Sequence, residues 1–232
     1  MNVTNTLRLF SGPVVLAIFL GGCATSQPIP DLLQPQSSGL GIEITLQAPV
    51  AIFTSSPSQV FFAKTDGEDG LLQQSIYRSN YVKDGRAYLL NAKPGTYAAV
   101  ATFVSRDSVP AAPPPPGISV SMTVGRTGYT TYFSKELLEQ TKVTVGESDF
   151  VFMGKYVIGE STGLEGADAI QIHYQNVIAP GATTGGILHL MSGDYHYRGD
   201  LVERNNDKET REEFFLNAKK DLAGSGWIAR LD

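Results

Sequence analysis

Alternation of apolar and polar residues with a period of two is the feature that most restricts what this chain can fold into. Ile42, Ile44 and Leu46 alternate with polar residues, and successive side chains of a β-strand point to opposite faces of a sheet. Further short segments of strand character follow at residues 59–64, 86–91, 118–124, 129–133 and 141–145. Turn dipeptides separate them at Asp66-Gly67, Asp69-Gly70, Asp84-Gly85 and Pro94-Gly95. The sequence therefore predicts a mainly β fold, a β-sandwich or a partly closed barrel.

Two of the expected strands, residues 98–104 and 150–158, are apolar on both faces, so each needs a covering layer on both sides. An opposing sheet supplies one layer, and a C-terminal helix at residues 208–223 is expected to supply the other. That helix has a capping box of Thr210 and Glu213, or Asp207 as its N-cap. The apolar residues expected to pack on the sheet are Phe214, Phe215, Ala218, Leu222, Trp227 and Leu231.

The region before this helix is rich in glycine and has weaker strand patterns at residues 168–175, 186–191 and 195–201. The pattern leaves open whether these strands extend the first sheet or form one of their own. We therefore expect a β-sandwich domain at residues 40–160. A β extension with the C-terminal helix packed on it follows at residues 161–232.

Composition limits the function classes. The 232 residues include 18 basic and 23 acidic side chains, and the net charge of −5 gives no basic excess for nucleic acid. The single cysteine, Cys23, excludes an internal disulfide framework and a cysteine-based zinc site.

Residues 1–22 have the organisation of an export signal. Arg8 provides a weak positive region, and residues 14–20 are seven consecutive apolar residues. A membrane-spanning helix needs about 20, so this stretch is too short to serve as a stable anchor. Small residues and the cysteine follow at once, in the order Leu20-Gly21-Gly22-Cys23.

This tetrapeptide resembles the lipobox of bacterial lipoproteins. The resemblance implies cleavage between Gly22 and Cys23, an S-diacylglyceryl group on the Cys23 thiol and an acyl group on its amine. Ala24 stands where the family's inner-membrane retention signal has Asp, which favours the outer membrane, with the domain facing the periplasm or the cell surface. The alternative is an ordinary secretory signal followed by a buried cysteine.

Acyl chains, rather than charge, would hold such a protein on the membrane. Loss of Arg8 with the signal leaves 17 basic and 23 acidic side chains, a net charge of −6. Each buried methylene contributes about 0.8 kcal/mol, and two or more chains anchor stably. Residues 23–39 are the acylated cysteine and a flexible tether rich in Pro, Gln and Ser, which reaches roughly 50 Å when extended. The alternative is a disordered tail with no spacing role.

The segment around Pro94, Gly95 and Tyr97 resembles the "PGxY" hairpin of transthyretin-like and carboxypeptidase-regulatory-like sandwiches. Pro presets the second turn position and Gly adopts the positive φ of the third. With residues 76–78 and 145–156, the segment is similar to uncharacterised envelope lipoproteins built on such a sandwich. These motifs are structural, so the resemblance implies no catalytic residue.

No catalytic, metal-binding or cofactor-binding motif is complete. His173, His189 and His196 lack the spacing of a zinc motif, although a three-histidine site assembled by the fold remains an alternative. The acidic segment 65–70 lacks the spacing of an EF-hand and is expected to be a solvated turn. The glycine-rich segment 181–186 lacks the Lys-Ser/Thr of a phosphate loop. The pentapeptide Gly159-Glu160-Ser161-Thr162-Gly163 matches the spacing G-x-S-x-G, whereas Gly224-Ser225-Gly226 follows a helix rather than a strand.

The sequence therefore predicts a lipid-anchored envelope lipoprotein that is a non-enzymatic binding or scaffolding module, with an unknown protein or glycan partner. The alternative is a lipid-anchored hydrolase of envelope glycans or peptides. A third possibility is a surface adhesin, for which Arg198-Gly199-Asp200 alone is weak support. Tyr195 and Tyr197 either pack on the strand face, which is favoured, or form a partner patch.

Overall fold

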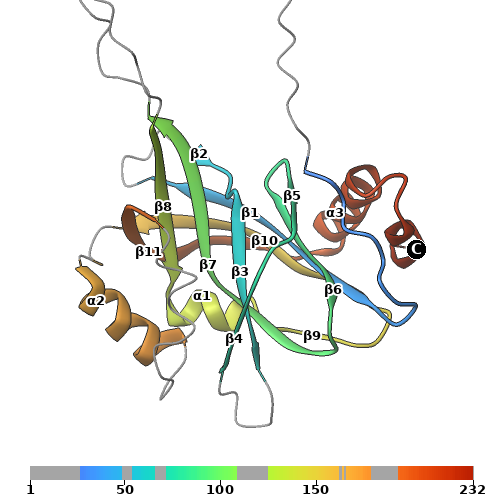
Figure 1. The fold of residues 1–232 in the computed structure, drawn as a ribbon, viewed down its shortest axis with the longest axis horizontal. Helices are drawn as coiled ribbons and strands as arrows, with labels where there is room; N and C mark the ends of the chain where they lie inside the picture. Colours follow the sequence, from blue (N-terminus) through green and yellow to red (C-terminus); the bar gives the residue numbers. More distant parts are fainter. Residues whose placement is uncertain are drawn as a thin grey trace, which may run out of the picture.

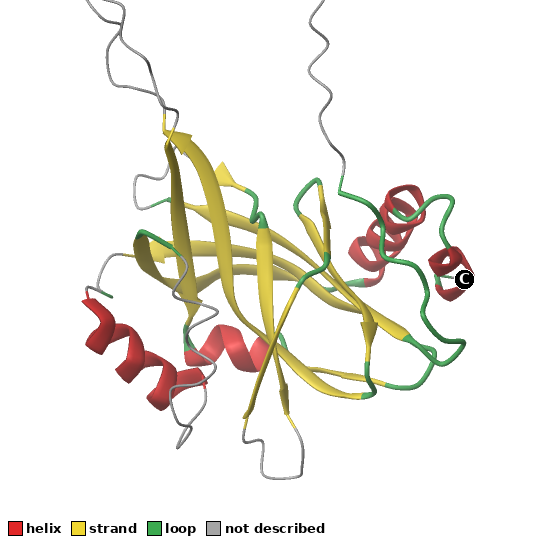
Figure 2. Ribbon diagram, viewed as in Figure 1, coloured by secondary structure: helices red, strands yellow, loops and turns green. Residues whose placement is uncertain are grey.

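A computed structural model describes residues 27–48, 54–65, 72–108, 125–161, 164, 166–178 and 193–231 of the chain (Figure 1). The strands are β1 (Ser38–Gln47), β2 (Thr54–Ser55), β3 (Gln59–Thr65), β4 (Leu72–Arg78), β5 (Tyr81–Lys83), β6 (Arg86–Ala92), β7 (Gly95–Ser108), β8 (Gly125–Phe133), β9 (Val143–Val145), β10 (Phe150–Ser161) and β11 (Tyr195–Asn205). The helices are α1 (Lys135–Gln140), α2 (Gly166–His173) with a π-helical turn (Tyr174–Ile178), α3 (Lys208–Asp221) and a 3-10 helix (Gly226–Arg230). The prediction of a mainly β fold with a C-terminal helix is confirmed (Figure 2).

The described strands form one curled sheet in the order β4-β3-β7-β8-β11-β10-β1-β6-β5, with β2 added to β1 and β9 added to β7. The β1–β10 and β8–β11 pairs are parallel, and the others are antiparallel. Because the hydrogen-bonded path is continuous, a sandwich of two separate sheets is not confirmed. β11 lies between β8 and β10, so this strand of the glycine-rich region extends the first sheet.

The two end strands of this path, β4 and β5, are joined by only two residues, Ser79 and Asn80. The Ser79 amide donates to the Val60 carbonyl on β3 (2.7 Å), and the Asn80 amide donates to the Tyr88 carbonyl on β6 (2.9 Å). The chain therefore crosses from one edge of the curled sheet to the other, which brings the two edges together.

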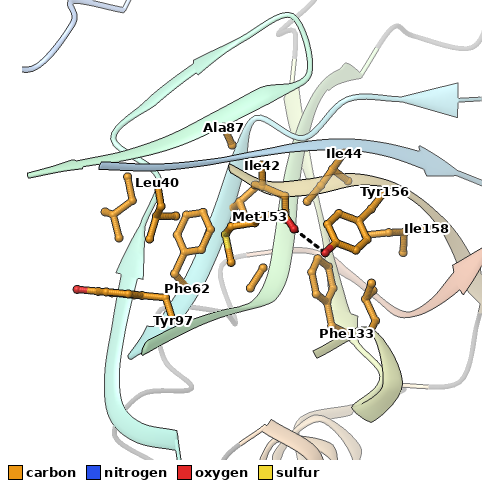
Figure 3. Packing of buried hydrophobic residues seen from close by; sticks show 14 of the residues in the cluster. Leu40, Ile42, Ile44, Phe62, Ala87, Tyr97, Phe133, Met153, Tyr156 and Ile158 are labelled. Carbon is orange, nitrogen blue, oxygen red and sulfur yellow. Dashed lines mark hydrogen bonds between the residues drawn. The ribbon is translucent and has the colours of Figure 1, made fainter. Parts of the chain in front are cut away.

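The main core lies on the inner face of the curled sheet (Figure 3). Ile42, Ile44 and Leu46 of β1 are buried and their neighbours Glu43, Thr45 and Gln47 are less so, as the period of two predicts. Burying an Ile or Leu side chain contributes about 1.5–3 kcal/mol. Residues labelled in Figure 3 that meet these side chains from the other strands are Phe62, Ala87, Tyr97, Phe133, Met153, Tyr156 and Ile158.

Helices cover the outer face in two places. On β10, the ring of Phe152 stacks on Phe214 of α3 with 4.1 Å between centroids, so α3 covers this strand as predicted. On β7, the outer residue Val100 instead packs with Leu138 of α1 and Ile170 of α2. Both strands have the two covering layers that their apolar faces require, but α1 and α2, rather than the C-terminal helix, cover β7.

The prediction of a strand at residues 168–175 is wrong, because this segment contains α2 and the start of the π-helical turn. Ile170, Ile172 and Tyr174 alternate with polar residues, which led to the prediction. Only Ile170 and Tyr174 are buried, and Ile172 is 57% exposed. A spacing of four places residues on one face of a helix, so the same residues fit both periods. The expected strands at residues 118–124 and 186–191 lie outside the described residues.

The ends of α3 follow the sequence signals. Asp207, the alternative N-cap, accepts a hydrogen bond from the Thr210 amide at 2.7 Å. Lys219 and Lys220 lie in the last turn, where the helix dipole favours cations. Gly224 has a φ of +80° just beyond the helix, as the end signal predicts.

Two of the predicted turns differ in outcome. Asp84 and Gly85 have φ values of 48° and 80° and join β5 to β6 as a two-residue hairpin, which confirms the prediction for this dipeptide. At the second turn, Gly95 has a φ of 146° and Tyr97 is buried, as expected. The strands joined there, β6 and β7, do not pair with each other, so this turn is a crossover and not a hairpin.

Residues 27–37, which we call the strap, lie against the domain. The sequence assigned them to a flexible tether at residues 23–39. In the structure the strap runs along the end of the molecule that carries α3 (Figure 1), and its Ile29 and Leu32 pack against the cluster of Trp227, Phe214 and Leu222.

Candidate functional site

A row of aromatic and polar side chains lines one rim of the curled sheet, on the face that holds the main core. β8 and β11 run parallel there, and their register sets Tyr195 beside Tyr129 and Tyr197 beside Thr131. The Tyr129 ring stacks on Tyr195 (centroids 5.3 Å apart, 15° between planes) and on Tyr197 (6.2 Å, 13°). Tyr195 and Tyr197 thus stack on Tyr129 along the strand face. Tyr195 remains 54% exposed and offers an open ring.

Glu160, near the end of β10, supplies a carboxyl group to this rim. Its side chain is buried, with 8% of the residue exposed, and the Thr131 hydroxyl donates to its Oε1 at 2.6 Å. Burial raises the pKa of Glu160 above its ordinary value, against the opposing effects of the Thr131 hydrogen bond and the Arg106 charge. Among the described residues, Thr131 is the only group that donates to this carboxyl.

Arg106, near the end of β7, completes what we call the rim cluster: Arg106, Tyr129, Thr131, Glu160, Tyr195 and Tyr197. The Arg106 guanidinium lies 5.0 Å from the centre of the Tyr129 ring, and its Nη2 donates to the Ser55 hydroxyl at 2.9 Å. Its charge is opposite to that of an ionised Glu160. The rim cluster therefore has little net charge.

Thr102 lies next to the rim cluster and has an unused hydrogen-bonding group. The β7–β8 register sets it opposite Thr131, and its buried hydroxyl has no hydrogen-bond partner among the described residues. Buried polar groups normally have a partner, from the protein or from a bound molecule. With the open ring of Tyr195 and the carboxyl of Glu160, this arrangement can stack on a ring and hydrogen bond to hydroxyl or amide groups.

A second buried carboxyl, that of Asp221 at the end of α3, has a full set of partners. Arg86 donates to both carboxyl oxygens (Nε–Oδ2 2.7 Å, Nη2–Oδ1 3.1 Å), and the Tyr88 hydroxyl donates to Oδ2 at 2.7 Å. The Lys83 ammonium lies 3.8 Å from Oδ1. Burial and the hydrogen bond to Asp221 raise the pKa of Tyr88 far above the physiological range. This network fixes α3 to β5 and β6 and leaves no free group for chemistry.

An open groove of about 480 Å³ lies along the outer face of α3. Its walls combine apolar and charged side chains: Phe150, Arg211, Glu212, Phe215, Leu216, Lys219, Arg230 and Leu231. Among the described residues that line the groove, Glu212 is the one carboxylate, and none is a histidine.

Most site residues considered from the sequence are not part of the rim cluster. Gly22, Cys23, His189, the acidic segment 65–70 and the glycine-rich segment 181–186 lie outside the described residues, apart from Thr65 at the end of β3. Arg198 on β11 donates to the Asp200 carboxyl at 3.2 Å on the surface. The Ser225 hydroxyl caps the 3-10 helix, which is a structural role.

Two of the histidines meet one tyrosine. His173 of α2 and His196 of β11 both contact the Tyr132 ring, with centroids 6.3 and 5.9 Å away. Burial lowers the pKa of both histidines, and His173 Nε2 lies 3.0 Å from the Phe133 carbonyl. In the part of the chain that the structure describes, no three His, Cys, Asp or Glu residues are grouped to hold a metal.

Sequence reasoning found two members of the rim cluster and missed the rest. The sequence analysis names Tyr195 and Tyr197 as aromatic residues that could form a partner patch. Glu160 and Thr131 are 29 residues apart, and only the β8–β11–β10 pairing brings them together. The signal available in the sequence was the acidic residue at the end of an otherwise apolar strand.

Comparison with known proteins gives no family for this chain: no family model, no curated protein and no solved structure matches it. Within the described residues, no helix has the length and apolar character needed to cross a membrane.

Proposed function

We propose that this chain is a bacterial envelope lipoprotein, anchored by lipid on Cys23 at the outer membrane and serving there as a non-enzymatic binding module. The observation that carries the anchor is the sequence Leu20-Gly21-Gly22-Cys23 directly after the apolar residues 14–20. The anchor requires no membrane-spanning helix, because two or more acyl chains hold a protein stably.

The rim cluster supports a binding role. When Glu160 is ionised, its charge is opposite to that of Arg106, which favours a neutral ligand over an ion. The exposed ring of Tyr195 can stack on the apolar face of a ring, while Glu160, farther along the row beside Thr131, accepts or donates hydrogen bonds. A neutral molecule with a ring face and several hydroxyl groups, such as a glycan of the envelope, fits this combination.

The anchor is tested by replacing the cysteine. The Cys23→Ala variant should leave the membrane fraction, and mass spectrometry of the wild-type N-terminal peptide should show cleavage before Cys23 and added acyl chains. The matched variant Ala24→Asp keeps the cysteine but introduces the retention residue of the lipoprotein family, so it should stay acylated and move to the inner membrane. An unmodified wild-type cysteine, or a Cys23→Ala variant that remains in the membrane, would contradict the proposal.

The alternative of a lipid-anchored hydrolase has one supporting observation, the raised pKa of the buried Glu160 carboxyl. A carboxyl group with a raised pKa can act as a general acid. Hydrolysis of a glycosidic bond usually requires two carboxyl groups, and Glu160 is the single carboxyl group of the rim cluster. Purified protein should be incubated with envelope glycans and peptides beside a Glu160→Gln control. Turnover that Glu160→Gln abolishes would establish the hydrolase.

A further inference from the structure

Two residues that bind the strap, Asn91 and Ser148, have an uncommon backbone conformation. Asn91 has a φ of 62°, and its amide group donates to the Asp31 carbonyl (2.8 Å) and accepts from the Leu33 amide (3.0 Å). Ser148 has a φ of 65°, and its amide donates to the Gln36 carbonyl at 3.1 Å. Residues other than glycine rarely adopt positive φ, and such strain persists where the surrounding structure requires it.

Further contacts fix the strap along its length. The buried Trp227 ring donates from Nε1 to the Pro30 carbonyl at 2.8 Å. The Ser148 hydroxyl donates to the Pro35 carbonyl at 3.2 Å. At the start of the strap, the Gln27 side chain donates to the Asn80 carbonyl at 2.9 Å. The strap is therefore a bound part of the domain from Gln27 onward, and not a spacer.

We propose that the strap holds the domain directly against the lipid surface, with the region around β5 and the end of α3 facing it. This inference rests on the proposed anchor at Cys23. Only four residue steps separate Cys23 from Gln27, so their separation is at most about 14 Å. A free tether from Cys23 to Gly39 would reach roughly 50 Å. Docking of the strap removes most of that reach.

The position of Gln27 determines which face is close to the lipid. Gln27 is bonded to Asn80, the residue before β5, and Tyr81 of β5 donates from its hydroxyl to the Asp221 carbonyl at the end of α3 (3.0 Å). Figure 1 shows the described chain beginning beside β5 and α3, while α2 lies at the other end of the molecule. The lipid surface is thus the partner of the β5–α3 region.

Energy transfer to labelled lipid headgroups tests this orientation. The full chain is produced in acylated form and reconstituted into vesicles of phosphatidylethanolamine and phosphatidylglycerol that carry a headgroup acceptor. A donor dye is placed on Lys220→Cys, exposed near the end of α3, or on Ile172→Cys, exposed on α2. α3 packs on β10 and α2 packs against β7, three strand spacings of about 4.8 Å away along the sheet, so we expect higher transfer efficiency at position 220 than at position 172.

Two further variants release the domain. A flexible Gly/Ser insert of about 16 residues between Ala24 and Thr25 adds roughly 20 Å of reach. The Asn91→Gly, Trp227→Phe pair keeps the length of the chain and removes contacts that hold the strap. Both should reduce transfer at position 220 and make positions 172 and 220 alike.

Equal transfer efficiency at positions 172 and 220 in the protein without the insert would overturn the orientation while leaving the anchor intact. Transfer efficiency that the insert does not change would do the same. Failure of the anchor has a different signature. A Cys23 that reacts with the dye, with protein that does not float with the vesicles, would overturn the anchor and the orientation together.

Discussion

The two buried carboxyl groups of this protein, Asp221 and Glu160, differ in how completely they are satisfied. Asp221 receives two hydrogen bonds from Arg86, one from Tyr88 and a nearby ammonium from Lys83. Glu160 receives one hydrogen bond, from Thr131. A buried carboxylate with a full set of donors fixes structure, whereas one with a single donor retains capacity for a ligand or a proton.

The same contrast applies to the two ends of the molecule. The end with α3 has aromatic packing, the bound strap and the paired Asp221 carboxyl, although the buried Asn206 Oδ1 before α3 has no hydrogen-bond partner among the described residues. The rim has an exposed Tyr195 ring and a Thr102 hydroxyl that has no hydrogen-bond partner in the described part of the chain. Structural roles thus gather at one end and binding capacity at the other, which four experiments can test.

The largest effect is expected at Asp221. The Asp221→Asn variant keeps the shape of the side chain but removes the buried counter-charge of Arg86, which keeps only the exposed Asp84 carboxylate at 3.4 Å from its Nη2. Breaking a buried ion pair in this way costs about 3–5 kcal/mol of the free energy of unfolding. Denaturant unfolding of the two proteins measures the difference. The Tyr88→Phe variant, which removes one hydroxyl donor, should lose much less, and equal losses would contradict the importance of the charge pair.

Loss of the Asn91 side chain should release the strap at a smaller cost. The Asn91→Gly variant tolerates the positive φ but loses both hydrogen bonds to the strap, so we expect about 1 kcal/mol of destabilisation. Hydrogen exchange should show the Leu33 amide becoming unprotected while amides of β1 and β10 keep their protection. Uniform loss of protection throughout the sheet would show that the strap is not a separate unit.

The Glu160→Gln variant should change how stability depends on pH. Burial raises the pKa of Glu160 in the folded protein, so the folded state binds this proton more tightly than the unfolded state. Stability from this group is present below the unfolded pKa of about 4.3 and is lost as pH rises through the folded pKa. Thermal unfolding from pH 4 to pH 8 should show Glu160→Gln gaining stability relative to wild type as pH rises. A constant difference would contradict the raised pKa.

The smallest change in stability is expected at Tyr195. The Tyr195→Ala variant removes a half-exposed ring, so its free energy of unfolding should stay within about 0.5 kcal/mol of wild type. Binding of soluble envelope glycan fragments, measured by calorimetry, should weaken at least about tenfold, since a stacked ring contributes roughly 1.4 kcal/mol or more. Unchanged glycan binding, or none in the wild type, would remove the rim cluster as a glycan site.

The sequence predicted those parts of the fold that depend on local signals. The period of two located β1, and the cap and end residues located α3, because neighbouring residues decide these features. The prediction of a strand at residues 168–175 is wrong because the spacing of Ile170 and Tyr174 fits both a strand and a helix. Packing against α1 and β7 decides in favour of the helix. The six-residue helix α1 was missed because its signals are limited to Ser134 as N-cap and the pair Leu137 and Leu138.

The candidate site and the strap depend on distant residues, and for that reason composition misled. The composition of segment 27–37, rich in Pro and Gln, is typical of a tether. Its Ile29 and Leu32 nevertheless pack against the cluster of Trp227, which is almost 200 positions away in the sequence. Glu160 likewise becomes a site residue only through its neighbour Thr131 on another strand. No local pattern records either pairing.

The position of β1 also has a consequence for how the chain reaches its folded state. β1 is the first long strand, but it lies between β10 and β6, and the parallel β1–β10 ladder joins residues more than 100 positions apart. Leu231, almost the last residue, is buried with Trp227. Such non-local pairing is slow to form, so the sheet cannot close until nearly the whole polypeptide has been delivered.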